Sequence, residues 1–390
     1  MDFPKRDQFL NIARFKSPGE LCLLAPTFNE FWPETLESWV RQGVTEQMLN
    51  SRFRGGYFQF FHFRELHEVS TGLIAADIDL KGHNFRYLIP PLCPTFEPMI
   101  ISEDEHTFTI INAAGQKARV FKDNPEKMPT YLEQPVKDRA TWEEYKKKLD
   151  PGTPGRFPLD WDNYAQRMNS KDEPVMLFTG GFFGFLREWM GVEKLLYMFY
   201  DDPVLVEDMM EHVCYMELEC VKRVLKDIRV DFVYFWEDMA FKTGPLISPA
   251  MFRKYMVPRY KRVTDLLRAN GVDVIVVDSD GNIDQLIPLW LEGGVNGFWP
   301  LECAAGMNAV ALRKKYGKDV VLFGNIDKRE LMKDEAAVRT EVMSKVPFLL
   351  GQGGYFPTVD HGVPPDVPFE NFVYYINTLR EVAGLDKLPD

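Results

Sequence analysis

Carboxylate side chains in this sequence directly follow a short apolar run. The run 274–277 ends at Asp278, and Ser279, Asp280 and Gly281 come next. An uninterrupted run of β-branched residues is typical of a strand buried on both faces, and a glycine permits a tight turn after it. Two carboxylates at the tip of such a strand can hold a cation or exchange protons. Capping of a turn is the alternative role for both residues.

The same pattern recurs at other apolar runs. The further polar residues at or just beyond the end of a predicted strand are Asp77, Glu237, Glu302, Asp327 and His361. Several carboxylates gathered in one place cannot all stay ionised without a cation, a basic substrate or shifted pKa values. One histidine among carboxylates is a ligand set that suits zinc and other divalent ions. A helix cap remains an alternative for Asp327, and Glu302 is also consistent with buried structure.

These residues share a location only if their strands belong to one parallel sheet. Strands are predicted near residues 75, 177, 233, 275, 298, 321 and 356, and an eighth is sought within 57–63. Helical segments separate most of them, which indicates repeated βα units. We therefore predict an α/β fold, a (β/α)8 TIM-type barrel whose strand tips meet at one mouth. A doubly wound open sheet is the alternative, but no GxGxxG motif supports it.

Two segments interrupt this regular pattern. Residues 1–60 are predicted to form an N-terminal helical segment rich in aromatic residues, and residues 61–390 are predicted to form the barrel. Alternating apolar residues over about 99–122, on either side of Ala113-Ala114-Gly115-Gln116, indicate an inserted β-hairpin.

Composition limits the classes of partner. The 46 basic and 58 acidic residues give a net charge of −12, which argues against nucleic acid or an anionic membrane as a partner. No apolar run is long enough to span a bilayer. Five cysteines without metal-binding spacing, and an N-terminus without an apolar signal region, predict a cytoplasmic protein. The 14% aromatic content suits a pocket for flat ligands, although most such rings serve the core.

Five motifs occur in a fixed order along residues 70–380. They are Ala75-Ala-Asp-Ile78, Gly180-Gly-Phe-Phe-Gly-Phe-Leu186, Ser248-Pro-Ala-Met-Phe-Arg-Lys-Tyr-Met-Val-Pro258, Gly324-Asn-Ile-Asp327 and Asp360-His-Gly-Val-Pro-Pro-Asp-Val-Pro-Phe-Glu-Asn371. Together they resemble the uroporphyrinogen decarboxylase superfamily, which also holds cobalamin-dependent methyltransferases. The resemblance implies a (β/α)8 barrel.

The decarboxylase branch of that superfamily matches at Asp77 and His361. It implies a cofactor-free decarboxylase of uroporphyrinogen or another aromatic acid, which is the alternative function. Two departures count against it. The arginine-rich motif that handles substrate carboxylates has no counterpart in residues 1–60, and the family's active-site tyrosine falls at Trp189.

The methyltransferase branch matches at its metal positions. The resemblance implies a divalent metal, expected to be zinc, held by Glu237, Asp278, Asp280 and His361. The thiolates of that branch are replaced here by oxygen and nitrogen donors, a harder site that suits an ether oxygen as leaving group. The arrangement resembles the methyltransferase component of aryl ether O-demethylases.

The activity implied is methyl transfer from a small methoxyaromatic substrate to the Co(I) corrinoid of a partner protein, with the metal polarising the leaving oxygen. The expected catalytic residues are Asp77, Glu237 and His361. The expected substrate-binding residues are Tyr57, Trp189, Tyr234, Trp236 and Trp299. Tyr57, Tyr234 or Asp77 could instead supply a proton. A non-catalytic barrel that binds a corrinoid or tetrapyrrole is the third hypothesis.

Overall fold

The computed structural model describes residues 5–25, 31–45, 56–70, 74–89, 91–123 and 128–388, and only the backbone of 56–57, 74–80 and 83–89. Its central element is a parallel sheet with the strand order β1-β8-β9-β12-β13-β14-β15. The strands are β1 (His67–Ser70), β8 (Val175–Gly180), β9 (Phe232–Trp236), β12 (Ile275–Asp278), β13 (Gly297–Trp299), β14 (Val321–Phe323) and β15 (Tyr355–Phe356). The chain is therefore an α/β protein, as predicted.

The sequence misplaced the first parallel strand. The apolar run near residue 75 forms β2 (Ile74–Leu80), which pairs antiparallel with β3 (His83–Ile89) outside the parallel sheet. The first parallel strand is β1, whose sequence His-Glu-Val-Ser is too polar to be recognised as a buried strand. The prediction of an eighth strand within 57–63 is also wrong, because helix α4 (Gly56–Phe61) occupies most of that segment.

The parallel sheet curves around helix α1 (Lys5–Ala13). The ring of Phe9 lies 4.8 Å from the rings of both Phe232 in β9 and Phe356 in β15, although three strands separate β9 from β15 in the sheet. Strand residues on this concave side, such as Val276 and Phe323, join the same apolar cluster. No ladder joins β15 to β1 among the described residues, so closure into an eight-stranded barrel stays a prediction.

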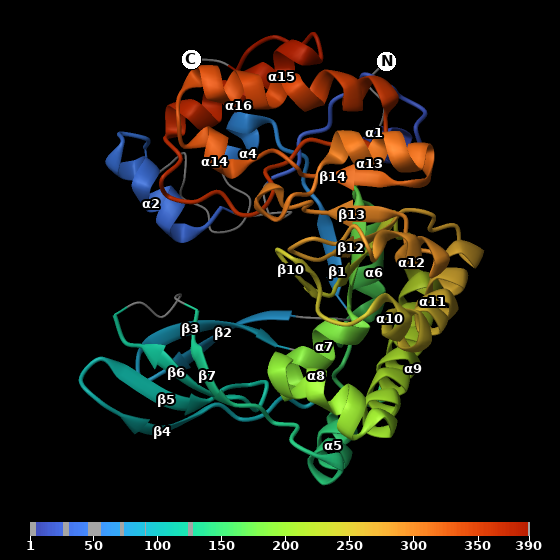
Figure 1. Ribbon diagram of the computed structural model, residues 1–390. Coiled ribbons are helices and arrows are strands. Elements are labelled where there is room, and N and C mark those ends of the chain that lie inside the picture. Colours follow the sequence, from blue (N-terminus) through green and yellow to red (C-terminus); the bar gives the residue numbers. More distant parts are fainter. Residues whose placement is uncertain are drawn as a thin grey trace.

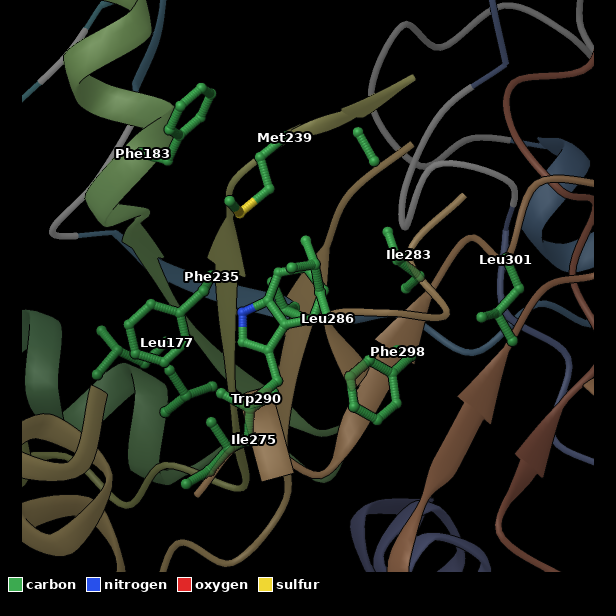
Figure 2. Packing of buried hydrophobic residues seen from close by; sticks show 14 of the residues in the cluster. Leu177, Phe183, Phe235, Met239, Ile275, Ile283, Leu286, Trp290, Phe298 and Leu301 are labelled. Carbon is green, nitrogen blue, oxygen red and sulfur yellow. The ribbon is translucent and has the colours of Figure 1, made fainter. Parts of the chain in front are cut away.

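Helices cover the convex side of the sheet. Because successive strand residues point to opposite faces, Leu177, Phe235, Ile275 and Phe298 face these helices. Figure 2 shows their side chains gathered around Trp290 of α12. The helices that follow β8 are α7 (Phe182–Met190), α8 (Val192–Asp201), α9 (Pro203–Asp227), α10 (Pro249–Tyr255), α11 (Val257–Ala269), α12 (Ile287–Glu292), α13 (Ala309–Tyr316), α14 (Lys328–Leu331), α15 (Glu335–Gln352) and α16 (Phe369–Val382).

An antiparallel sheet interrupts the βα pattern before β8. The predicted hairpin is present as β5 (Thr107–Ile111) paired with β6 (Lys117–Phe121). Two flanking strands, β4 (Met99–Glu103) and β7 (Thr130–Glu133), extend it to four strands. Figure 1 shows this sheet at the opposite end of the molecule from α15 and α16. Helices α5 (Arg139–Lys146) and α6 (Trp161–Asn169) lead from it to β8.

Two further elements border the carboxyl ends of the parallel strands. Helix α2 (Pro33–Arg41) belongs to the N-terminal segment, in which helices were predicted. Strands β10 (Ala240–Phe241) and β11 (Gly244–Pro245) form a small hairpin after β9. Among the described residues, no helix is long and apolar enough to cross a membrane.

Candidate active site

Two aspartates lie at and just after the carboxyl end of β12, and a turn follows them. Asp278 is the last residue of the strand, and Asp280 precedes Gly281. Gly281 has φ +81°, and an added Cβ would lie 2.4 Å from the carbonyl oxygen of Ala240 in β10. Its amide also donates to Oε2 of Glu302 at 3.0 Å. A glycine is therefore required directly after the two aspartates.

Asp278 lies in a buried, largely aromatic environment. The hydroxyl of Tyr234, from the neighbouring strand β9, donates to its Oδ2. The Tyr234 ring is stacked with Phe178 at 5.3 Å between centroids and lies 6.2 Å from Trp299. Burial raises the pKa of the Asp278 carboxyl well above its usual range, and repulsion from Asp280 adds to this. Asp278 therefore favours the protonated form and can act as an acid.

Asp280 faces the histidine that follows β15. Its Oδ2 lies 3.3 Å from Nε2 of His361, and the two side chains are 36% and 33% exposed. The hydrogen bond to Asp280 raises the pKa of His361, while partial burial lowers it less. Among the residues that the structure describes, the buried Oδ1 atom of Asp280 has no hydrogen-bond partner. The pair thus favours the protonated imidazole and leaves one acceptor for a ligand.

Glu237 has a different environment from the one its strand-tip position predicts. Its two oxygens accept hydrogen bonds from the amides of Phe182, Phe183 and Gly184 at 2.8–2.9 Å, at the start of α7. Tyr260 also donates to it. Burial raises its pKa to about 7, and the donors oppose this shift. Both oxygens are engaged, so this conformation uses Glu237 to fix the start of α7 to the end of β9.

The predicted aromatic residues have separate locations. Trp299 lies beside Tyr234, whereas Trp189 is fully buried in the core, stacked on Phe185. Trp236 is half-buried and lies under the guanidinium of Arg187 at 5.5 Å. The resemblance placed Trp189 at an active-site position, and its contacts here are those of a core residue.

Two predicted residues cannot be placed by their side chains. The side chains of Tyr57 and Asp77 lie outside the described residues. The backbone of Asp77 pairs with Arg86 in the antiparallel β2–β3 pair. The expectation that Asp77 ends a strand of the parallel sheet is therefore wrong.

The remaining acidic residues have local partners. Asp327 accepts the amide of Arg329 at 2.9 Å and pairs with its guanidinium, as the capping alternative predicts. Asp360 is buried and accepts the amides of Cys303 at 2.8 Å and Lys328 at 3.1 Å. Sequence reasoning did not single out Asp360, although it is adjacent to His361 and fixes the start of that loop.

A divalent metal requires three or more ligands held together. Within the part of the chain that the structure describes, His, Cys, Asp and Glu side chains form no group of three or more that could hold an ion. The side chains as placed do not fit a metal centre, because Glu237 is engaged at α7 and Asp278 at Tyr234. Zinc binding by Glu237, Asp278, Asp280 and His361 stays a prediction, and we derive no catalytic step from it.

Comparison with known proteins identifies the family. The family model for uroporphyrinogen decarboxylase (URO-D) matches residues 107–382. The chain belongs to the URO-D family, and its structure is an α/β fold.

Curated relatives are distant. Uroporphyrinogen decarboxylase of Sulfurovum sp. is 26% identical over 192 residues, which are 48% of this chain and 51% of that protein. The enzyme of Thermus thermophilus is 30% identical over 142 residues, 35% of this chain and 39% of that protein. The enzyme of Geobacter sp. (strain M21) is 21% identical over 81% of this chain and 85% of that protein. The chain thus spans about half the length of the Sulfurovum relative, and less of the Thermus one.

A solved structure matches over nearly the whole chain. A methyltransferase from Methanosarcina mazei superposes with a TM-score of 0.58 and 12% identity, covering 98% of this chain and 99% of that one. At this identity the match shows a shared fold.

Proposed function

We propose that this protein transfers a methyl group from a small methoxyaromatic substrate to the Co(I) corrinoid of a partner protein. The observation that carries the proposal is the hydrogen bond from Tyr234 to the buried Asp278, beside the Asp280–His361 pair. Burial raises the pKa of Asp278 and so favours its protonated form. The site supplies an acid next to aromatic walls, which is what cleavage of an aryl methyl ether requires. The methyltransferase fold match is compatible with this activity.

The acid solves the main chemical difficulty of the reaction. When the nucleophilic acceptor attacks the methyl carbon, the carbon–oxygen bond breaks and its electron pair stays on the phenolic oxygen. A neutral ether leaves poorly unless that oxygen receives a proton or an equivalent charge. Asp278 bonds to Tyr234 only through Oδ2. Its Oδ1 is free to carry the proton to the leaving oxygen, and water restores that proton after product release.

The charge balance of the site favours a substrate with few negative charges. Asp278 is neutral when protonated, and Asp280 and His361 cancel each other when both are charged. The nearest cations have acidic partners, Arg187 with Asp238 and Lys328 with Asp360. Among the described residues, the site therefore offers no unpaired cation to a substrate with many carboxylates. This argues against uroporphyrinogen, which carries eight.

The aromatic side chains suit a flat ring. Phe178, Tyr234 and Trp299 lie along the concave side of the sheet. Trp299 is level with Asp278 in the strand register, and the Tyr234 hydroxyl reaches Asp278 from two residues earlier. Stacked and edge-to-face contacts with such rings each contribute about 0.5–1.5 kcal/mol beyond burial. A methoxyphenol would gain most of its affinity from these contacts and its reactivity from Asp278.

The proposal is tested by mixing the purified protein with chemically reduced cobalamin and a panel of methoxyphenols and methoxybenzoates. Methylcobalamin formation by the wild type, reduced roughly 10²–10⁴-fold in Asp278→Asn, supports it. Asp327→Asn is the matched control, since that carboxylate serves the start of α14. No methyl transfer from any donor would overturn the proposal.

Decarboxylation remains the second candidate because the family match and the curated relatives carry that name. A protonated Asp278 could also deliver a proton to the carbon that loses carbon dioxide. Incubation with uroporphyrinogen, followed by chromatography of the products, separates the two. Coproporphyrinogen formation without methyl transfer would favour the decarboxylase.

A further inference from the structure

Helix α2 is bound along one face to the loop that follows His361. Thr35, Ser38 and Trp39 donate side-chain hydrogen bonds to the backbone carbonyls of residues 363, 365 and 367. Gln42 accepts the amide of residue 369 at 2.9 Å. The four positions have the i, i+3, i+4, i+7 spacing of one helix face, and the segment that they hold contains a turn closed by the bond from the amide of residue 367 to the carbonyl of residue 364.

This interface is specific and largely buried. Thr35 and Trp39 are fully buried, and the Ser38 and Trp39 bonds are each 2.9 Å long. A buried carbonyl that loses its donor costs about 1–3 kcal/mol, so separating α2 from this segment is unfavourable. The helix and the loop of His361 therefore form one unit, although more than 300 residues separate them in sequence.

Trp32, directly before α2, is where this unit meets the active site. Its ring lies 5.7 Å from the imidazole of His361, at an interplanar angle of 72°. A Cβ added at Gly362 would lie 2.5 Å from the indole. Only glycine at position 362 allows the indole to approach the backbone this closely, so the contact depends on both Trp32 and Gly362. Trp32 is nevertheless 39% exposed, on the rim of the site.

We propose that Trp32 is a positioning residue that holds the His361 imidazole against Asp280. The imidazole contacts both the indole, at 5.7 Å between ring centroids, and the Asp280 carboxylate, 3.3 Å from Nε2. The face of α2 bonded to 363–369 fixes the indole in place. Without the ring, His361 can rotate toward solvent, since its side chain is already 33% exposed. The kinetic consequence rests on the function proposed above, and the conformational one does not.

The kinetic test compares Trp32→Ala with Trp32→Phe. Because a misplaced reacting group costs roughly tenfold to a hundredfold in rate, we expect Trp32→Ala to lower kcat by that factor and to leave KM for the methyl donor within about twofold. Trp32→Phe retains a ring against His361 and should restore most of the rate. Tyr200→Ala removes an exposed ring from α8, away from His361, and should change neither kcat nor KM. Equal rates for Trp32→Ala and the wild type would overturn the proposal.

A spectroscopic test works without any activity. The chain has six histidines, so the imidazole resonances are resolvable and His361→Gln assigns the relevant one. Loss of the indole ring current in Trp32→Ala should shift the His361 resonances, and Trp32→Phe should shift them less. Shifted resonances in a protein without methyl transfer would refute the proposed function and leave the positioning role intact. Unmoved resonances would refute the positioning role alone.

If Trp32→Ala does not fold, Ser38→Ala decides the question. It removes one bond between α2 and the carbonyl of residue 365 and keeps the indole. A smaller shift of the His361 resonances and a smaller loss of kcat are expected. Wild-type resonances in Ser38→Ala would show that α2 does not control His361.

Discussion

Asp278 and Asp280 are two residues apart on one strand tip, and their carboxyl groups have opposite surroundings. Asp278 is 8% exposed and receives the Tyr234 hydroxyl, whereas the Asp280 side chain is 36% exposed and faces His361 at 3.3 Å. The two carboxyls have different partners, Tyr234 and His361. One favours its protonated form and the other pairs with a histidine, so the two have different chemical roles.

Removal of the Tyr234 hydroxyl tests whether its hydrogen bond orients Asp278 as the acid. In Tyr234→Phe, the Asp278 carboxyl loses the hydrogen bond from the Tyr234 hydroxyl, and the ring that stacks on Phe178 is kept. We expect a loss of about 1 kcal/mol in the free energy of unfolding, measured with urea, and a fall of roughly tenfold in kcat. Unchanged kcat would show that Tyr234 does not orient the acid.

The Asp280–His361 pair predicts a pH dependence of stability. Asp280 raises the folded-state pKa of His361 above its ordinary value of 6.5. The pair therefore contributes stability that is fully present below that ordinary pKa and is lost as the pH rises through the folded pKa. Asp280→Asn should lower the free energy of unfolding at pH 6 and have a smaller effect at pH 9. An equal loss at both pH values would contradict the ion pair.

Glu237 predicts a loss of stability in the same direction, over a lower pH range. Burial raises its folded-state pKa from 4.5 to about 7, so the folded state binds the extra proton between these values. Its contribution to the free energy of unfolding should fall by about 3 kcal/mol as the pH rises from 4.5 to 7. Glu237→Gln cannot titrate, so its stability relative to the wild type should improve over that range. A constant difference would show that the donors at α7 keep Glu237 ionised.

A substitution at Gly281 tests whether the turn after the two aspartates requires glycine. An alanine there would combine a positive φ with a Cβ 2.4 Å from a backbone carbonyl. We expect Gly281→Ala to destabilise the protein by more than about 2 kcal/mol. Gly271→Ala is the matched control, because Gly271 has φ +83° and nothing within 4 Å of an added Cβ. Equal losses of stability in the two variants would show that the close contact of the added Cβ at Gly281 is not the cause.

Much of the parallel sheet could be predicted from local sequence, because buried strands are uninterrupted apolar runs. That signal identified β12 and its two aspartates. The same signal mistook β2 for a parallel strand, since an apolar run does not say which partner it pairs with. It also missed β1, which is half polar.

The sequence predicted the location of a site residue only where its place just beyond a strand end determines which way its side chain points. His361 and Asp280 meet as expected from strand tips that share one edge. Glu237 shares that position, but the amides of α7 capture its carboxylate, and no local signal reveals a helix start in space. Trp32 was missed because its place depends on α2 docking to a segment more than 300 residues away.

The most direct test of the account follows the methyl group itself. The protein is incubated with reduced cobalamin and 2-methoxyphenol labelled with ¹³C in the methoxy group, and the products are analysed by ¹³C NMR. We expect the label to appear in methylcobalamin, with catechol formed in equal amount, and both to be lost in Asp278→Asn. Label that stays in the methoxyphenol, for this and every other methoxyaromatic tested, would contradict the proposed methyl transfer.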